Sequence, residues 1–179
     1  MARLILLDRD GVINFDSPDY IKSPDEWRAI PGSIEAIAAL RSGGRIVAVC
    51  TNQRGIARGK FSLSDLEAIH AKMSKALADA GTRVDAVTFC PHAADAGCNC
   101  RKPKPGMLLS MMERFQVSPE ETVFVGDTIR DLEAAAAAGC AAVLVRSGKG
   151  PEEEAEALRR GLSFTAYDDL AQFTRAMGP

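Results

Sequence analysis

Hydrophobic positions along the chain follow two alternating patterns. Runs that are apolar at nearly every position predict buried strands, and five occur, over 4–7, 46–50, 86–89, 122–125 and 141–145. Between them, apolar residues recur at helical spacing over 34–40, 66–77, 107–115 and 132–138. A polar stretch at 148–156 leads into two last helices around 153–160 and 168–177. This alternation predicts the α/β class, with a doubly wound, mostly parallel, Rossmann-like sheet covered on both faces.

Single residues refine this pattern. Ser33 precedes one helical run and Ser62 or Ser64 precedes another, which predicts N-terminal caps, while Gly139 stands where a helix should stop. His70 lies within the second helical run and is interpreted as a surface or partly buried residue with no catalytic part. Ligands of such sheets bind at the carboxyl ends of the strands, so the residues that follow each apolar run are the candidates for chemistry.

Composition narrows the class of protein. The chain has 179 residues and a net charge of −2, which predicts one domain over 1–179 and no nucleic-acid partner. The longest run without a formal charge, 134–145, is shorter than the ~20 residues that span a bilayer. The first residues reach Asp8 too soon for a signal peptide. We therefore expect a cytoplasmic protein without a membrane partner, and a monomer, because no heptad seam is present.

Acidic side chains follow two of the strands. Asp8 and Asp10 come directly after the first run, and Asp127 follows the fourth. Carboxylates gathered in one crevice repel each other unless a cation neutralises them, and Mg²⁺ prefers such oxygen ligands. The hydroxyl of Thr51 and the ammonium of Lys102 could hold phosphoryl oxygens. Together they predict phosphoryl transfer through an aspartyl-phosphate.

The five cysteines fall into two groups. Cys50 and Cys140 adjoin apolar sequence and are interpreted as small buried hydrophobes. The others form the pattern Cys90-x-His92-x5-Cys98-x-Cys100, a closed Cys₃His set that suits a structural zinc ion. This zinc loop, 90–100, would fold a segment that has no core of its own and would aim Arg101 and Lys102.

Four ordered segments resemble the motifs of the haloacid-dehalogenase superfamily of phosphatases, in a form without a large cap domain. These segments are Asp8-Arg-Asp10-Gly-Val-Ile, Thr51-Asn52, Arg101-Lys102-Pro and Gly126-Asp127-Thr128-Ile-Arg-Asp131. Longer matches over 8–14, 51–59, 90–92 and 98–106 are similar to the heptose-bisphosphate phosphatases within that superfamily. The histidinol-phosphatase branch shares the zinc loop and is the nearest alternative.

The resemblance assigns a role to each catalytic residue. Asp8 would attack phosphorus, and Asp10 would protonate the leaving oxygen and later accept a proton from water. Thr51 and Lys102 would stabilise the phosphoryl group. Mg²⁺ would be held by Asp8, by the backbone carbonyl of Asp10 and by Asp127, with Asp131 behind them.

The resemblance also implies the substrate contacts, with a short flap at about 15–27 in place of a cap. The expected contacts are Asp16, Tyr20, Thr51, Asn52, Gln53, Arg54, Arg101, Lys102 and Thr128. The flap departs from the family pattern, because the segment 16–20 is one residue longer and lacks a glycine.

Cations around the expected site point to the class of substrate. A single phosphate does not account for all of Arg54, Arg58, Lys60, Arg101, Lys104 and Arg130. A sugar bisphosphate does, since guanidinium groups bind phosphate in a bidentate way. Together with the resemblance to heptose-bisphosphate phosphatases, this implies hydrolysis of the 7-phosphate of a heptose 1,7-bisphosphate, giving heptose 1-phosphate for nucleotide-activated heptose and lipopolysaccharide synthesis.

Two alternatives remain open at this stage. One is a phosphatase of histidinol phosphate or of another small phosphate monoester. The other is a phospho-acceptor module of the receiver type, which has no enzymatic activity. Asp10 and the zinc loop count against the receiver, which needs slow loss of its phosphoryl group.

Overall fold

Six strands form one sheet within residues 2–178, which the computed structural model describes. They are β1 (Leu4–Leu7), β2 (Ile46–Asn52), β3 (Ala86–Cys90), β4 (Thr122–Gly126), β5 (Ala141–Val145) and β6 (Thr165–Tyr167). Their order is β3-β2-β1-β4-β5-β6, and all neighbours run parallel. The predicted α/β fold with a doubly wound sheet is confirmed.

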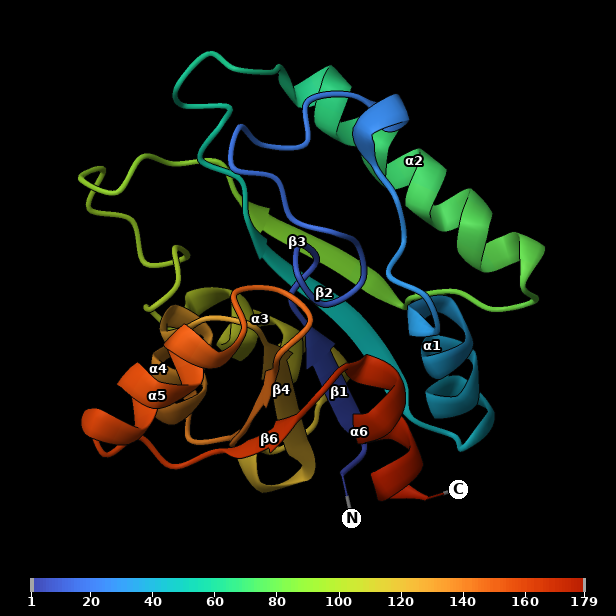
Figure 1. The fold of residues 1–179 in the computed structure, drawn as a ribbon, viewed down its shortest axis with the longest axis vertical. Helices are drawn as coiled ribbons and strands as arrows, with labels where there is room; N and C mark the ends of the chain where they lie inside the picture. The colour runs from blue at the N-terminus through green and yellow to red at the C-terminus, as the bar shows by residue number, and fades with distance from the viewer. Residues whose placement is uncertain (1, 179) are drawn as a thin grey trace.

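Helices cover both faces of the sheet (Figure 1). One face packs against α1 (Ser33–Ser42), α2 (Leu63–Asp79) and α6 (Leu170–Met177). The other packs against α3 (Gly106–Phe115) and α4 (Ile129–Ala138), with α5 (Pro151–Arg159) beside α4. Two short 3₁₀ helices, η1 (Pro24–Glu26) and η2 (Pro119–Glu121), lie in connections. Within residues 2–178 no cap domain is inserted between these elements.

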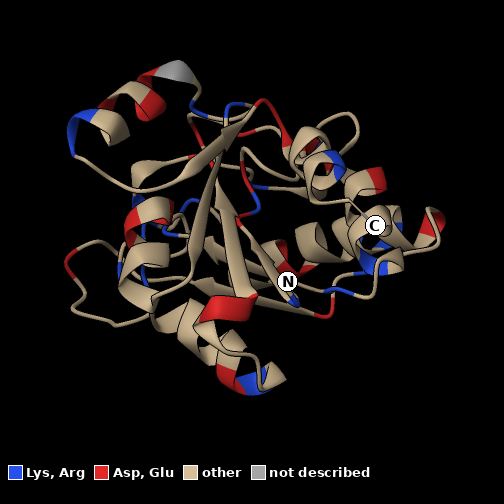
Figure 2. Ribbon diagram, turned by 90° about the horizontal axis from the view of Figure 1, so that it is seen from below, with Lys and Arg blue, Asp and Glu red and all other residues tan. Residues whose placement is uncertain are grey.

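The central strand β1 shows why its sequence is apolar at every position. Ile5 and Leu7 belong to the cluster with α1, α2 and α6, whereas Leu4 and Leu6 belong to the cluster with α3 and α4. All four side chains are fully buried, and burying each contributes about 1.5–3 kcal/mol. None of the six strands carries a charged residue, and Lys, Arg, Asp and Glu lie on the surrounding helices and loops (Figure 2).

Two local features differ from the sequence-based expectations. Strand β6 was not expected, because its three residues form no apolar run; it pairs with β5 at the sheet edge. The cap predicted at Ser33 was wrong: the N-cap is Gly32, and the buried Ser33 hydroxyl donates a hydrogen bond to the backbone carbonyl of Ile13. The cap at Ser62 is confirmed, since its hydroxyl accepts from the backbone N–H of Asp65.

The topology concentrates polar residues at one edge of the sheet. Successive strands lead outward from β1 in both directions, through β2 to β3 and through β4 to β6. The loops after β1, β2 and β4 therefore meet at the point where the winding reverses, which is the usual position of a ligand crevice. None of the helices described between residues 2 and 178 has the length and apolar character needed to cross a bilayer.

Candidate active site

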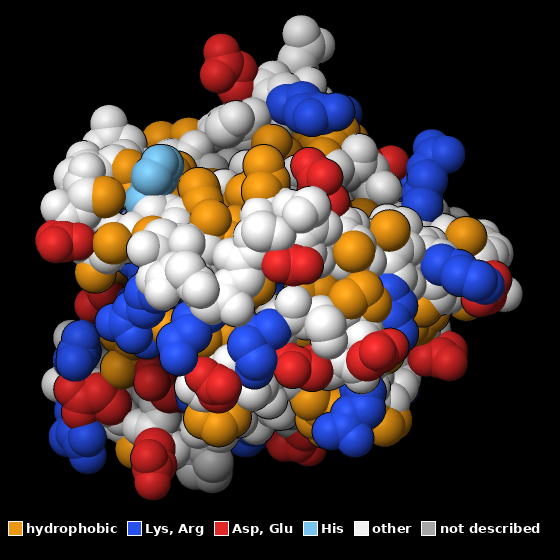
Figure 3. Space-filling model, turned by 90° about the horizontal axis from the view of Figure 1, so that it is seen from above, with side chains coloured by type: hydrophobic (Ala, Val, Ile, Leu, Met, Phe, Trp, Pro, Cys, Tyr) orange, Lys and Arg blue, Asp and Glu red, His pale blue; other side chains and the backbone are white. Residues whose placement is uncertain are grey.

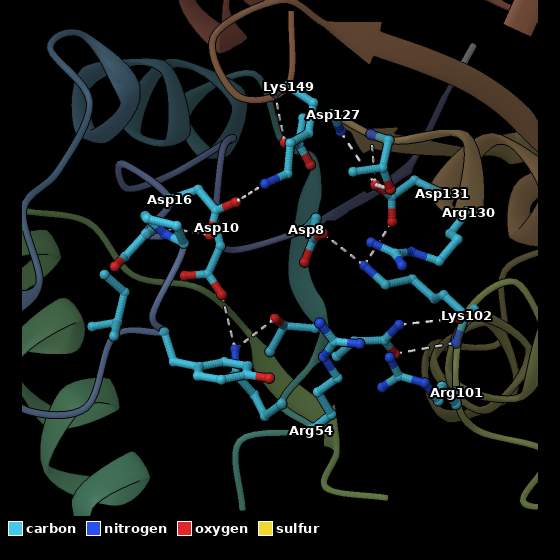
Figure 4. Close-up of a pocket in the computed structure, with 18 residues that line it drawn as sticks. Asp8, Asp10, Asp16, Arg54, Arg101, Lys102, Asp127, Arg130, Asp131 and Lys149 are labelled. Atoms are coloured by element: carbon cyan, nitrogen blue, oxygen red, sulfur yellow. Dashed lines mark hydrogen bonds and ion pairs between the residues drawn. The ribbon is translucent and has the colours of Figure 1, made fainter. Parts of the chain in front are cut away.

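A cavity of about 180 Å³ opens at the carboxyl ends of the central strands (Figure 4). The structure brings all of the predicted catalytic, magnesium and substrate residues to its walls. They are Asp8, Asp10, Asp16, Tyr20, Thr51, Asn52, Gln53, Arg54, Arg101, Lys102, Asp127 and Thr128. The walls also contain Ser17, Pro18, Ile21, Arg130, Asp131 and Lys149.

Asp8 lies at the base of the cavity, directly after β1. One of its carboxylate oxygens accepts a hydrogen bond from the backbone N–H of Arg9 at 2.7 Å, and the other lies 2.8 Å from Lys102 Nζ. The same Nζ lies 2.7 Å from Asp131 Oδ1. The side chains of Lys102 and Asp131 are only 2% and 1% exposed. One buried ammonium group thus forms ion pairs with two carboxylates, those of Asp8 and Asp131.

The carboxylate of Asp10 is turned toward a different set of partners. Its Oδ1 accepts from Arg9 Nη2 and from Asn14 Nδ2, both at 2.9 Å, and its Oδ2 accepts from Gln53 Nε2 at 3.0 Å. Burial by itself would raise the pKa of Asp10, but the charge of Arg9 and these hydrogen bonds outweigh it and lower the pKa below 3.8. Asp10 is therefore held as an oriented carboxylate.

Asp127 and Asp131 come from the turn between β4 and α4. Asp131 caps α4: its Oδ2 accepts from the hydroxyl and the backbone N–H of Thr128, at 2.8 and 3.0 Å. Asp127 Oδ2 accepts from the backbone N–H of Lys149 at 3.1 Å. Glycine is required at 11 and 148, because a Cβ at either position would collide with the Asp127 carboxylate. The chain therefore packs closely around this acid.

Negative charge exceeds positive charge at the base of the cavity. Carboxylate oxygens of Asp8, Asp127 and Asp131 all lie within 4.8 Å of one another. Burial raises the pKa of Asp8 to about 6, and the carboxylates of Asp131 and Asp10 add to this effect against the opposing pull of Lys102. Burial, with Asp131 and Asp8 nearby, also holds the pKa of Asp127 well above 3.8. Such a cluster suits a divalent cation with oxygen ligands.

Residues at the end of β2 hold Lys102 in place. Asn52 Nδ2 donates to the backbone carbonyl of Lys102, and the backbone N–H of Lys102 donates to Asn52 Oδ1, both at 3.1 Å. Thr51 is buried, and its hydroxyl oxygen accepts from Gln53 Nε2 at 3.0 Å. Thr51 also lines the cavity, so its hydroxyl group lies close to the space for a ligand.

The flap, residues 15–27, forms one wall of the cavity. Asp16 Oδ2 lies 2.6 Å from Lys149 Nζ, an ion pair that bridges the flap and the loop after β5. Tyr20 adopts a left-handed backbone conformation with φ of 64°, and its hydroxyl oxygen accepts from Arg58 Nη1 at 3.1 Å. Arg54 lies over the Tyr20 ring, 5.9 Å from its centroid. The flap is thus tied to two neighbouring loops.

The cationic rim differs from the expected one. Arg54, Arg101, Arg130 and Lys149 line the cavity. Arg58, Lys60 and Lys104 do not: Arg58 bonds to Tyr20, Lys60 lies 3.7 Å from Asp19, and Lys104 donates to the backbone carbonyl of Cys98. Figure 3 shows Lys and Arg side chains gathered beside acidic ones on the face seen from above.

Two residues of this site were missed in the sequence. Lys149 lies four residues after the end of β5, and residues that follow the strands are the ones expected at the ligand crevice. Its position after a strand was therefore a signal that could have identified it. Arg9 lies inside the first motif, where it is buried and forms an ion pair with the adjacent Asp10. The sequence pattern does not indicate that an arginine at this position is buried or which residue it pairs with.

The cysteine and histidine cluster lies beside the active-site cavity, at the end of β3. Its four ligand atoms lie within 4.8 Å of one another. Cys90 Sγ is 3.7 Å from Cys98 Sγ, and His92 Nδ1 is 3.5 Å from Cys90 Sγ and 3.3 Å from Cys100 Sγ. In a tetrahedral zinc site with bonds of ~2.3 Å to sulfur, neighbouring sulfurs stand about 3.8 Å apart. The four residues therefore fit a zinc ion.

Comparisons with known proteins agree with this site. A family model of HAD-hydrolase-like proteins, where HAD stands for haloacid dehalogenase, matches residues 99–173. The D-glycero-beta-D-manno-heptose-1,7-bisphosphate 7-phosphatase of Pseudomonas putida is 50% identical over 177 residues, 98% of this chain and 99% of its own. Its namesake from Pseudomonas aeruginosa is 52% identical over 174 residues, 97% of each chain.

Solved structures give the same relationship. The D,D-heptose 1,7-bisphosphate phosphatase of B. bronchiseptica, crystallised with magnesium and phosphate, is 48% identical and aligns with a TM-score of 0.93 over 99% of this chain and 98% of its own. The enzyme of Burkholderia thailandensis is 42% identical, with a TM-score of 0.75 over 98% and 97% of the two chains. This chain therefore belongs to the heptose-1,7-bisphosphate 7-phosphatase family of the haloacid-dehalogenase-like hydrolases.

Proposed function

We propose that the chain hydrolyses the 7-phosphate of D-glycero-beta-D-manno-heptose 1,7-bisphosphate, giving heptose 1-phosphate for the synthesis of nucleotide-activated heptose and lipopolysaccharide. The observation that carries this is the placement of Asp8 at the base of a cation-rimmed cavity, in a chain about half identical to enzymes of that name. The same relatives disfavour histidinol phosphate as the substrate.

The reaction needs two steps at Asp8. In the first, an oxygen of Asp8 attacks phosphorus, the bond from phosphorus to the sugar oxygen breaks, and Asp10 gives that oxygen a proton. In the second, water attacks phosphorus and gives a proton to Asp10, the bond from phosphorus to the Asp8 oxygen breaks, and inorganic phosphate leaves. Lys102 and the Thr51 hydroxyl stabilise the charge on the phosphoryl oxygens in both steps.

The donors that surround Asp10 suit this double role. Arg9, Asn14 and Gln53 keep its carboxylate oriented, and Asp10 lines the cavity that would receive the substrate. A substrate that carries phosphate brings negative charge close to this carboxylate, which favours its protonated form. Asp10 can then serve as the acid of the first step and the base of the second.

Magnesium fits the excess of carboxylates. Asp131 already gives one oxygen to the cap of α4 and the other to Lys102, so it supports the site from behind. We propose that Asp8, Asp127 and the backbone carbonyl of Asp10 hold the ion. When bound, it would offset the excess negative charge and polarise a phosphoryl oxygen.

Zinc fits the Cys90, His92, Cys98 and Cys100 cluster, and its role would be structural. Four protein ligands close a tetrahedral site, so no position remains for a substrate or a catalytic water. Arg101 and Lys102 follow the last ligand directly, and Arg101 Nη1 donates to the backbone carbonyl of His92 at 3.4 Å. The zinc loop would thereby fix both cations at the cavity wall.

The open rim supplies the proposed substrate contacts. Arg54, Arg101 and Arg130 would receive the distal phosphate, since each can form bidentate hydrogen bonds with it. Asp16 and Tyr20 from the flap, with Asn52, Gln53 and Thr128 from the strand ends, complete the wall that faces the sugar. We propose that residues 1–179 act as one phosphatase domain with these parts.

We also propose that the enzyme works in the cytoplasm as a monomer. Three of the five cysteines belong to the proposed zinc cluster, and the other two, Cys50 and Cys140, are separately buried, which differs from the disulfide framework of small secreted proteins. Its partner would be the small sugar bisphosphate, with neither nucleic acid nor membrane involved.

The test is a comparison of kcat/KM for the heptose 1,7-bisphosphate, fructose 1,6-bisphosphate and histidinol phosphate. The proposal predicts the highest value for the heptose. A higher value for histidinol phosphate would contradict it and would place the enzyme with the sister branch.

A further inference from the structure

The side chain of Arg9 lies behind Asp10 and is fully buried. Two of its nitrogens donate hydrogen bonds to Oδ1 of Asp10, Nε at 3.0 Å and Nη2 at 2.9 Å. One edge of the guanidinium group therefore faces the carboxylate. Its third nitrogen, Nη1, points to another element and lies 3.3 Å from Nε2 of His70. A hydrogen-bonded chain therefore runs from α2 to Asp10.

The contact defines the state of His70. Arginine has donors only, so Nε2 of His70 must be the acceptor, and the proton of the neutral imidazole must lie on Nδ1. Burial and the charge of Arg9 lower the pKa of His70 to about 4, although Asp10 opposes this. The ring is half-buried and packs at 59° to Phe89, with 6.1 Å between centroids. His70 is thus neutral near pH 7 and held in one orientation.

We infer that His70 is a positioning residue, which orients Asp10 through Arg9. The inference rests on the proposed role of Asp10 as acid and base. A buried guanidinium nitrogen that loses its acceptor carries a desolvation cost, so the group would turn toward another partner or toward water. Any such turn moves the two nitrogens that fix the plane of the Asp10 carboxylate. His70 therefore controls where Asp10 presents its proton, without touching the substrate.

The leaving group distinguishes this role from simple packing. A sugar alkoxide needs a proton as it departs, whereas p-nitrophenolate leaves without one. The parameter kcat/KM covers the steps up to formation of the aspartyl-phosphate. A misplaced Asp10 should therefore lower kcat/KM for the sugar substrate and barely change it for p-nitrophenyl phosphate.

The experiment compares His70→Leu, His70→Met and His70→Gln with wild type, and thermal melting verifies that each variant folds. Leu and Met remove the acceptor, and we expect kcat/KM for the heptose 1,7-bisphosphate to fall about tenfold, part of the ~10²–10⁴ that a general acid contributes. For p-nitrophenyl phosphate the change should stay below about threefold. The Oε1 atom of Gln can accept from Arg9, so His70→Gln should retain most of the activity.

Asp10→Asn serves as the reference. It should also lower kcat/KM for the heptose 1,7-bisphosphate more than for p-nitrophenyl phosphate, and by a larger factor than the His70 variants do. Equal losses on both substrates, an equal loss in His70→Gln, or no loss in either apolar variant would overturn the inference while Asp10→Asn remains impaired. An unimpaired Asp10→Asn would instead contradict the proposed role of Asp10, and the role of His70 with it.

Discussion

The Nζ atom of Lys102 lies 2.8 Å from Oδ2 of Asp8, and both groups sit at the base of the cavity. Asp131 faces the same ammonium, so the positive charge is shared. Burial opposes a charged lysine, yet the two carboxylates outweigh it and raise the pKa of Lys102. The free energy of unfolding therefore depends on Lys102 and Asp8, two charged residues that the proposed reaction also requires.

Lys102→Met should destabilise the protein and abolish efficient turnover. It leaves two buried carboxylates without their cation, and breaking a buried pair in this way costs about 3–5 kcal/mol. Urea unfolding at pH 8 measures the loss. Lys104→Met is the matched control, because Lys104 is exposed and outside the active-site cavity. If both variants lost the same stability, the ion pair would have no such role.

The stability of magnesium-free protein should depend on pH through Asp8. Its pKa is raised to about 6 in the folded chain, so the folded state binds its proton more tightly than the unfolded state. Stability from this group is therefore present below about pH 4 and is lost as the pH rises through about 6. Asp8→Asn removes the titration, and the difference in unfolding free energy between wild type and this variant should change over that range. A constant difference would contradict the raised pKa.

Each chain should contain one zinc ion when purified without chelators. Its removal, or Cys98→Ser, should loosen residues 91–105 and raise KM, because Arg101 follows the last ligand and bonds to His92 of the zinc loop, whereas Asn52 still holds the backbone of Lys102. Metal analysis, hydrogen exchange and steady-state kinetics with magnesium present measure these effects. Cys140→Ser is the control, since Cys140 lies outside the cluster. Full activity in Cys98→Ser, or protein without zinc, would refute the assignment.

Lys149→Met should raise KM for the sugar bisphosphate severalfold with little change in melting temperature. The variant removes a cation from the rim and frees Asp16 of the flap, while exposed ion pairs add only about 0–1 kcal/mol of stability. Lys60→Met is the control, because Lys60 pairs with Asp19 of the flap but does not line the cavity. Equal KM values for the two variants would exclude Lys149 from substrate binding.

The sequence predicts those strands that consist of a continuous apolar run. Strands β1, β2 and β4 bury nearly every side chain, and β3 and β5 are mostly apolar although part of each is half-buried or exposed, so hydrophobicity marks all five. Strand β6 is a short edge strand with exposed and half-buried residues, and its three residues pair only with β5, which no local pattern encodes. Ser33 likewise looks like a cap, but it bonds to Ile13, twenty positions away in the chain.

The site was predictable to the extent that its residues follow strands. Asp8, Thr51 and Asp127 stand at strand ends, and parallel topology brings them together. The division of cations was not predictable, because it depends on partners supplied by the flap and the zinc loop: Tyr20 engages Arg58 and Asp19 engages Lys60, while Lys149 is left at the cavity. Contacts between side chains of distant loops determine which cations line the cavity, and the spacing of residues in the sequence does not predict those contacts.

Chemical trapping of the covalent intermediate tests directly whether Asp8 is the nucleophile. Enzyme turning over heptose 1,7-bisphosphate with magnesium is quenched with acid within milliseconds, treated with borohydride, which converts an aspartyl-phosphate to homoserine, and digested for peptide mass spectrometry. If Asp8 is the nucleophile, homoserine appears at position 8 in wild type and not in Asp8→Asn, which should fold normally and show no turnover. Homoserine at another position, or turnover by Asp8→Asn, would contradict that assignment.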